Sequence, residues 1–276
     1  MSGGEPAGAG AFTAIVLAGE RPGVSPVAEA AGVCCKALAE VAGRPMVLRV
    51  LDALGQSKSI GRKILCGLPR EAVADVAELN EALTKGLVDW REGRDSPSSS
   101  ASSVLQTLDS EVQVLLTTAD HALLESRMVD YFCQQALGTG ADVVVALATY
   151  PQVEAAFPGV RRTVTRLRDN GYCGCNLFAF LTPRSRAMAD TWRQVEKQRK
   201  RPWRVIGILG WSSVLRYLFG LLSLEQALDR LSQRLGLRIA AVIMPFPKAA
   251  VDVDTPEDWE LVKRLATPGD CPFGRR

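Results

Sequence analysis

Short, mostly apolar runs recur along this chain and alternate with segments of helical periodicity. Six runs predict buried strands, at residues 12–17, 63–67, 87–90, 112–118, 142–148 and 239–245. Such runs are typical of parallel strands, which are covered on both faces. Apolar positions at helical spacing predict helices at 45–55, 71–83, 125–137, 184–199, 206–235 and 255–265. The alternation predicts an α/β protein with three α/β/α layers and a doubly wound, mostly parallel sheet joined by right-handed crossovers.

One segment departs from this pattern. Residues 162–168 alternate in polarity, Asp169-Asn170-Gly171 is a turn signal, and residues 176–181 are typical of an extended segment. This pattern predicts an antiparallel hairpin at an edge of the parallel sheet. Further on, Ser223 and Gln226 predict a capping box inside 206–235.

The composition fits one enzyme-sized domain. Of 276 residues, 47% are hydrophobic, which is enough for an extensive core. A net charge of only +3 argues against a nucleic-acid binder, which usually carries a strongly basic domain. Seven scattered cysteines make no disulfide framework, and this favours a reducing, cytoplasmic compartment. We expect a single domain at 11–267, flanked by flexible tails at 1–10 and 268–276.

Targeting and membrane signals are weak. Residues 1–10 are rich in glycine and alanine and lack a basic region before a long apolar core, unlike a signal peptide. Segment 203–222 is apolar but contains Arg204, Arg216 and three glycines, which argues against a membrane-spanning helix. Contact of this segment with a lipid stays an open alternative, and the oligomeric state cannot be read from the sequence.

The first predicted strand is followed by a long loop, residues 19–36. A glycine turn at this place lets backbone amides approach phosphate groups, and Arg21 and Lys36 can neutralise their charge. The candidate nucleotide-binding residues of this region are Leu17, Ala18, Gly19, Gly23 and Lys36. An ordinary surface loop with solvated basic residues explains the same pattern equally well.

Carboxylates stand at two further strand ends. Asp120 follows the run 112–118, and Asp254 directly precedes the last helix. Carboxylate oxygens are the ligands that Mg²⁺ prefers, so we expect Asp120 and Asp254 to bind it, with Asp252 on the same face as a second choice. The alternative is that these residues only cap turns and helices. His121 is the single histidine, which argues against a Ser-His-Asp hydrolase, and we expect it to support Asp120 or lie exposed rather than to act in catalysis.

Two other patterns are candidate ligand contacts. Residues 96–103 are nearly all serine and predict a helix start whose hydroxyls and amides face an anion or base, with Ser103 among them. Gly174 allows close backbone approach, and Asn176 can both donate and accept hydrogen bonds to an acceptor molecule. Low complexity and a simple glycine bulge are the alternatives. The spacings of Cys34-Cys35 and Cys173-Gly174-Cys175 do not match a structural zinc site.

Three sets of residues carry a family resemblance: Leu17-Ala18-Gly19 with Arg21, Gly23 and Lys36; Asp120; and Asp254-Thr255-Pro256-Glu257-Asp258. In this order they resemble the motifs of the MobA-like nucleotidyltransferases over roughly residues 12–266, with Asn176 near the family's substrate-contacting hairpin. The family's second glycine is Glu20 here, its Arg-Met-Gly is Arg21-Pro22-Gly23, and about a dozen residues separate these from Lys36.

The resemblance implies a nucleotide-diphospho-sugar transferase fold, an NTP, Mg²⁺ and pyrophosphate as the leaving group. We expect a phosphate or phosphonate oxygen of a small phosphorylated acceptor to attack the α-phosphorus, with Lys36, Arg21 and Asp120 as catalytic residues. A non-catalytic nucleotide sensor of the same fold is the first alternative. A nucleotide-sugar glycosyltransferase is the second, because Asp252-Val253-Asp254 spells the Asp-x-Asp metal motif of those enzymes.

Overall fold

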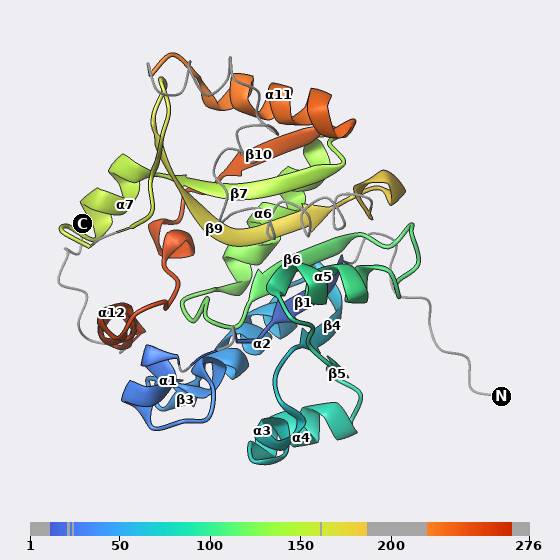
Figure 1. Ribbon diagram of the computed structural model, residues 1–276, viewed down its shortest axis with the longest axis vertical. Coiled ribbons are helices and arrows are strands. Elements are labelled where there is room, and N and C mark those ends of the chain that lie inside the picture. Colours follow the sequence, from blue (N-terminus) through green and yellow to red (C-terminus); the bar gives the residue numbers. More distant parts are fainter. Residues whose placement is uncertain (1–11, 21–22, 24, 161, 187–219, 267–276) are drawn as a thin grey trace.

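A computed structural model describes residues 12–20, 23, 25–160, 162–186 and 220–266. Its centre is an eight-stranded sheet in which seven strands follow the order β10-β7-β9-β6-β1-β4-β5 and β8 pairs with β9 (Figure 1). The strands are β1 (Phe12–Leu17), β4 (Ile60–Cys66), β5 (Asp89–Arg91), β6 (Val114–Thr118), β7 (Val143–Thr149), β8 (Thr165–Arg166), β9 (Gly171–Phe180) and β10 (Ile239–Ile243). A separate ribbon pairs β2 (Glu40–Val41) with β3 (Arg44–Pro45).

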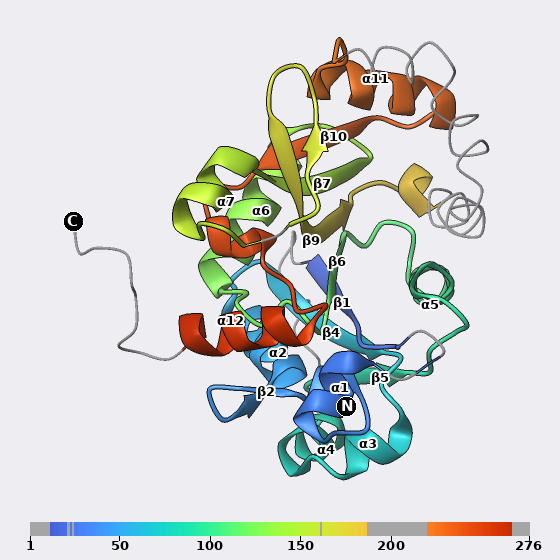
Figure 2. The same ribbon diagram turned by 60° about the vertical axis from the view of Figure 1, so that its left-hand side comes forward.

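Helices cover both faces of the sheet. They are α1 (Pro26–Ala31), α2 (Met46–Gln56), α3 (Arg70–Ala74), α4 (Ala77–Thr84), α5 (Pro97–Leu105), α6 (Ser126–Gly138), α7 (Tyr150–Ala156), α11 (Leu224–Leu235) and α12 (Pro256–Ala266). Short 3-10 turns are η1 (Lys36–Leu38), η2 (Pro183–Ser185) and η3 (Pro247–Ala250). Figure 2 shows α5 on one side of the sheet and α2 and α6 on the other.

The side chains of β1 explain this layering. Successive residues of a strand point to opposite faces. Ala14 and Val16 therefore belong to the larger core, which contains α2 and α6, whereas Ile15 and Leu17 belong to a second core with α5. All six residues of β1 are buried, as expected for a central strand covered on both faces.

The sheet order reverses at β1. Strands β4 and β5 extend the sheet on one side of β1, and the chain then returns to add β6 on the other side, parallel to β1. In open α/β sheets the connections diverge at such a switch point, and the crevice at the carboxyl ends of the strands is the usual ligand site. The fold therefore places the ends of β1 and β6, with the segments after Leu17 and Thr118, at this crevice.

The predicted fold class is confirmed, but the antiparallel strand does not lie at an edge. β9 lies inside the sheet and pairs antiparallel with both β6 and β7. The turn signal at 169–171 indicates only that β9 forms a hairpin with the strand before it. That strand, β8, has just two residues. The long-range neighbours of β9 leave no local mark in the sequence, so its inner position could not be predicted.

Several helix boundaries also differ from expectation. The segment 71–83 contains two helices, α3 and α4, and the predicted loop 19–36 contains α1. The Ser223–Gln226 capping box is confirmed, yet it begins α11 as a separate helix, because residues 220–223 are not helical. Residues 187–219 and both predicted tails lie outside the described residues. Within the described residues, no helix combines the length and apolar character needed to cross a membrane.

Candidate active site

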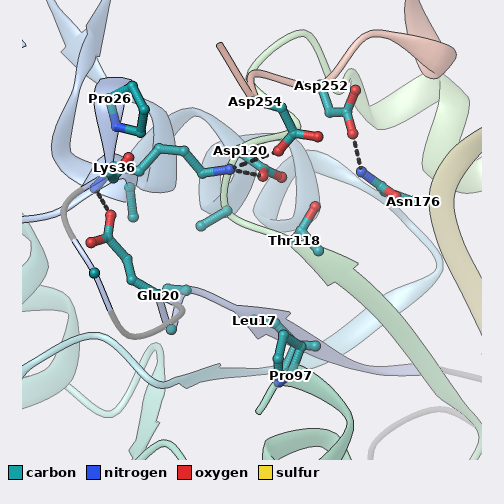
Figure 3. A pocket seen from close by; sticks show the side chains of 16 residues that line it. Leu17, Glu20, Pro26, Lys36, Pro97, Thr118, Asp120, Asn176, Asp252 and Asp254 are labelled. Carbon is teal, nitrogen blue, oxygen red and sulfur yellow. Dashed lines mark hydrogen bonds and ion pairs between the residues drawn. The ribbon is translucent and has the colours of Figure 1, made fainter. Parts of the chain in front are cut away.

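A cleft of about 420 Å³ lies at the carboxyl ends of β1 and β6 (Figure 3). Its wall includes most of the residues predicted from the first loop and from the two acidic segments. It is lined by Leu17, Ala18, Gly19, Glu20, Gly23, Ser25, Pro26, Lys36, Ala37, Pro97, Thr118, Ala119, Asp120, Asn176, Asp252 and Asp254. The fold thus brings together the start, the middle and the end of the sequence at the switch point of the sheet.

Lys36 joins the two acidic segments. Its Nζ donates a hydrogen bond to Asp120 Oδ2 at 2.5 Å and another to Asp254 Oδ1 at 3.1 Å. Figure 3 shows the ammonium group held between the two carboxylates. Burial alone would lower the pKa of Lys36, but Asp120 and Asp254 outweigh it and raise the pKa above its ordinary value. The lysine is therefore fully charged at neutral pH, and the two carboxylates share one cation.

Backbone hydrogen bonds position Asp120. Ala119 N–H donates to Leu17 O at 2.8 Å, which continues the pairing of β6 with β1 beyond the strand end. Val253 N–H donates to the carbonyl of Asp120 itself at 3.2 Å. On the far side, Arg49 of α2 donates from Nε to Ala122 O at 2.9 Å. Backbone hydrogen bonds to segments near both ends of the chain thus hold Asp120 in place, and they leave its carboxylate free to bind other groups.

The carboxylate of Asp120 has unused binding capacity. Its side chain is 14% exposed, and Oδ1 is buried without a hydrogen-bond partner. A buried carboxylate oxygen without a partner costs free energy unless a ligand or ion satisfies it. The neighbouring His121 is fully buried, so the expectation that it supports Asp120 or lies exposed is wrong in its second alternative. Burial lowers the pKa of His121 to about 4, and the imidazole is therefore neutral at pH 7.

Asp254 is positioned by the start of α12. Thr255 Oγ1 accepts a hydrogen bond from Asp258 N–H at 3.2 Å, and the Asp258 carboxylate accepts one from Thr255 N–H at 3.0 Å. This reciprocal pair is a capping box, with Pro256 in the first turn. The box uses Thr255 and Asp258, so the Asp254 side chain, 69% exposed, remains available to the cleft.

Asp252 lies deeper than Asp254 and bonds elsewhere. Its Oδ2 accepts from Asn176 Nδ2 at 2.9 Å, and its Oδ1 lies 3.3 Å from Arg162 Nη1. Burial raises its pKa, and so do the charges of Asp120 and Asp254. The three carboxylates therefore lie close enough to influence one another, with Asp252 at the inner wall of the cleft.

Asn176 adopts a left-handed backbone conformation, which residues other than glycine rarely adopt. Its φ is 48°, and it lies where the pairing of β7 with β9 shifts register between Val145 and Leu147. A bulge in a strand re-aims a side chain, and a left-handed residue there costs about 1 kcal/mol or more. Here the bulge directs the Asn176 amide at Asp252 and into the cleft.

The first loop is held over the sheet by close glycine contacts. Gly67 follows β4 with φ 96°, and a Cβ there would lie 2.7 Å from Gly19 N. Gly93, after β5, packs equally closely on Gly67. A Cβ on Gly19 itself would meet only ordinary contacts, at 3.6 Å or more. The backbone of the first loop therefore lies directly against Gly67, which the sequence reasoning did not single out.

A second cleft of about 530 Å³ adjoins the first. It contains Gly174 and shares Asn176, Asp252 and Asp254 with the first cleft. Its other lining residues are Arg162, Thr163, Thr165, Cys173, Ala250, Thr255 and Asp258. Gly174 and Asn176, predicted as acceptor contacts, thus lie beside the acidic residues; Gly174 lines only the second cleft, whereas Asn176 lines both.

Some predicted residues are not part of this arrangement. Ser103 does not line either cleft, and its Oγ lies 3.5 Å from Arg94 Nε. The serine helix instead presents its first residue, Pro97, to the cleft. Arg21 lies outside the described residues. Sequence reasoning missed Glu20, whose carboxylate accepts a hydrogen bond from Lys36 N–H, and Arg162, whose role depends on contacts 90 or more residues away.

The acidic residues fit a hard divalent cation. Among the described residues, no three or more His, Cys, Asp or Glu side chains form a ready-made metal cage. Mg²⁺ does not need one, because it usually takes one or two carboxylates and completes its shell with water and phosphate oxygens. Asp120 with its unsatisfied Oδ1 and the exposed Asp254 provide such a pair.

Comparison with solved structures finds proteins of similar fold. A hypothetical transferase from Thermus thermophilus is 30% identical, with a TM-score of 0.75 over 90% of this chain and 99% of that one. The 4-diphosphocytidyl-2C-methyl-D-erythritol synthase of Anaerococcus prevotii is 16% identical, with a TM-score of 0.56 over 93% and 96%. A CMP:2-keto-3-deoxy-manno-octonic acid synthetase in complex with CTP is also 16% identical, with a TM-score of 0.54 over 92% and 98%. The last two show the fold alone.

Sequence comparison identifies the family. No curated protein sequence matches the chain. The model of the MobA-like NTP transferase domain matches residues 14–205, which is more than half of the chain and includes most of β1, Lys36 and Asp120. Together with the Thermus structure, this match shows that the chain belongs to the MobA-like NTP transferase family.

Proposed function

We propose that this protein transfers a nucleoside monophosphate from an NTP to a phosphorylated small-molecule acceptor and releases pyrophosphate, with Mg²⁺ as its cofactor. The observation that carries the proposal is the meeting of Asp120 and Asp254, 134 positions apart in the sequence, at the single ammonium group of Lys36. An oxygen of the acceptor phosphate attacks the α-phosphorus of the NTP. The bond from that phosphorus to the bridging oxygen breaks, and pyrophosphate leaves with the electron pair.

The acidic residues would hold the cofactor. Asp120 and Asp254 are the candidate ligands, with Asp252 behind them. Bound Mg²⁺ neutralises phosphate charge and orients the α-phosphate. Asn176 and Arg162 hold the Asp252 carboxylate in place at the wall of the cleft, where it adds negative charge.

The basic residues would act on the leaving group. Phosphoryl transfer requires positioning and charge neutralisation more than a protein nucleophile. Lys36 is charged and lines the same cleft as Ala18 and Gly19, where the polyphosphate would lie. It can exchange its carboxylate partners for the oxygens of the leaving pyrophosphate, and Arg21 is proposed to assist it. Backbone groups of Leu17, Ala18, Gly19 and Gly23 would surround the nucleotide.

A non-catalytic nucleotide-binding relative is the second candidate, and Glu20 favours it. This carboxylate replaces a glycine of the family motif, lines the first cleft and bonds to the Lys36 backbone. A fixed negative charge beside the expected polyphosphate opposes the charge that develops on the leaving pyrophosphate, so it would slow the transfer step itself. Binding of an NTP without turnover over a broad acceptor panel is the behaviour that this candidate predicts.

Pyrophosphate release tests the proposal. The purified protein is incubated with each of the four NTPs, Mg²⁺ and a panel of phosphorylated acceptors, and pyrophosphate is measured enzymatically. NTP- and acceptor-dependent release supports the proposal, provided that chelation of the metal abolishes it. Consumption of a UDP- or GDP-sugar, with no pyrophosphate from any NTP, would instead identify a glycosyltransferase.

A further inference from the structure

The second cleft limits what kind of acceptor can bind. It joins the first cleft along Asn176, Asp252 and Asp254. An acceptor lying in it would therefore turn its phosphate toward Lys36 and the proposed metal site, where positive charge is available. The rest of the acceptor would face the remaining wall, formed by the hairpin of β8 and β9, Ala250 and the start of α12.

That wall has an excess of negative charge. Among the described residues that line the second cleft, Arg162 is the only cation, against Asp252, Asp254 and Asp258. The side chain of Arg162 is 7% exposed, with Nη1 3.3 Å from Asp252 Oδ1 and Nη2 3.2 Å from Asp258 Oδ1. Its charge is therefore already shared by two carboxylates and is not available for an anionic group of a ligand.

The uncharged part of the wall suits hydrogen-bond donors. Thr163 and Thr165 are exposed, and a Cβ at Gly174 would meet no atom within 4 Å, so the strand leaves open space beside the cleft. Asp252 and Asp258 complete this wall. Hydroxyl and ammonium groups can donate to these carboxylates and to the threonine oxygens, whereas an ionised phosphate or carboxylate has no hydrogen to donate and could only accept from the threonine hydroxyls.

We propose that the second cleft selects acceptors by charge: it takes a phosphate ester whose remaining part carries hydroxyl groups and is neutral or cationic, and it rejects acceptors with a second anionic group. This inference rests on the proposed function. Like charges placed together across an interface are strongly unfavourable, so we expect discrimination of at least about tenfold in affinity.

Three sugar 1-phosphates of different charge test the proposal. Glucosamine 1-phosphate carries an ammonium group at carbon 2, glucose 1-phosphate has no charge besides its phosphate, and glucuronic acid 1-phosphate carries a carboxylate at carbon 6. Each is titrated calorimetrically into the protein with Mg²⁺ and a non-hydrolysable NTP analogue, which measures binding without turnover. Glucuronic acid 1-phosphate is expected to bind at least about tenfold more weakly than glucose 1-phosphate, and glucosamine 1-phosphate at least as tightly as glucose 1-phosphate.

Two charge-matched variants locate the effect. Thr163→Lys adds a cation to the wall of the second cleft. We expect it to reduce the ratio of the affinity for glucose 1-phosphate to the affinity for glucuronic acid 1-phosphate at least about threefold. Ser110→Lys adds the same charge at an exposed position that lines neither cleft, and it should leave the ratio unchanged.

The outcomes separate this proposal from the proposed function. Equal or tighter binding of the glucuronate, binding of none of the three, or an unchanged ratio in Thr163→Lys would each overturn the charge selection. If the NTP analogue does not bind, the proposed function fails. The three titrations are then repeated on the protein without nucleotide and judged by the same ratios.

Discussion

The acidic and the basic sides of the first cleft are held in different ways. The acidic side is fixed by the fold: the capping box at Thr255 positions Asp254, and Val253 N–H bonds to the backbone of Asp120. On the basic side, the described side-chain contacts of Lys36 are ion pairs with Asp120 and Asp254, and its backbone N–H donates to the Glu20 carboxylate. The difference suggests a rigid set of carboxylates and a lysine that can exchange partners when a nucleotide arrives.

The largest expected effect is on catalysis by the acidic side. Asp120→Asn should lower the rate of pyrophosphate release about 10²–10³-fold, as is usual when one group that stabilises transition-state charge is lost. The fold should persist, because the backbone of Asp120 makes the bond to Val253. Initial rates together with a thermal melt measure both. Asp52→Asn, which removes a surface partner of Arg44, is the control, and a wild-type-like rate in Asp120→Asn would remove it from the mechanism.

The next effect concerns the loop on the basic side. Gly67→Ala should lower the free energy of unfolding by about 2–3 kcal/mol, because the new Cβ would overlap Gly19 in a backbone conformation that already disfavours a side chain. Gly86→Ala is the matched control: its φ is 68°, but a Cβ there meets no atom within 4 Å. Urea denaturation gives both values. Equal losses in the two variants would mean that the contact with Gly19 contributes nothing.

A smaller effect is expected at the cap of α12. Thr255→Ala should cost about 1 kcal/mol of stability, the usual loss for a helix N-cap. Thr255→Ser keeps the hydroxyl and should recover most of it. If the capping box positions Asp254, Thr255→Ala also weakens Mn²⁺ binding, whereas Thr255→Ser does not. Unchanged metal affinity in Thr255→Ala would show that Asp254 is positioned by other contacts.

The smallest effect is a pH dependence at Asp252. The pKa of Asp252 is raised in the folded protein, by burial and by Asp120 and Asp254, so its ionised form opposes folding. This cost is absent below the unfolded pKa near 3.8 and grows as pH rises through the folded pKa. Asp252→Asn should therefore gain stability relative to the wild type as pH rises from 4 to 7. Chemical denaturation at both values measures it, and a constant difference would contradict this sign.

The sequence predicted the parts of the site that depend on local order. Strand ends at Leu17 and Thr118 and the helix start at Thr255 can be recognised from neighbouring residues, and they placed Asp120 and Asp254 at one rim of the sheet. The three-layer fold followed from the same alternation of strands and helices. These predictions needed no knowledge of which strand lies beside which.

What the sequence did not predict depends on distant contacts. The inner position of β9 and the partners of Arg162 involve residues far apart in the chain, and the left-handed conformation of Asn176 depends on a shift against β7. Glu20 was read only as a departure from a motif, although it bonds to the backbone of Lys36. Ser103 was chosen from the serine-rich composition of its segment. Which residue of α5 reaches the cleft depends on how the helix is oriented, and that residue is Pro97.

The most direct test of the central claim is a crystal of the protein soaked with Mn²⁺ and a non-hydrolysable NTP analogue, with the metal located by its anomalous scattering. We predict a peak in contact with the carboxylates of Asp120 and Asp254, with Lys36 moved from between them to the polyphosphate. A bound nucleotide with Lys36 still bridging the two carboxylates and the metal elsewhere would contradict the account.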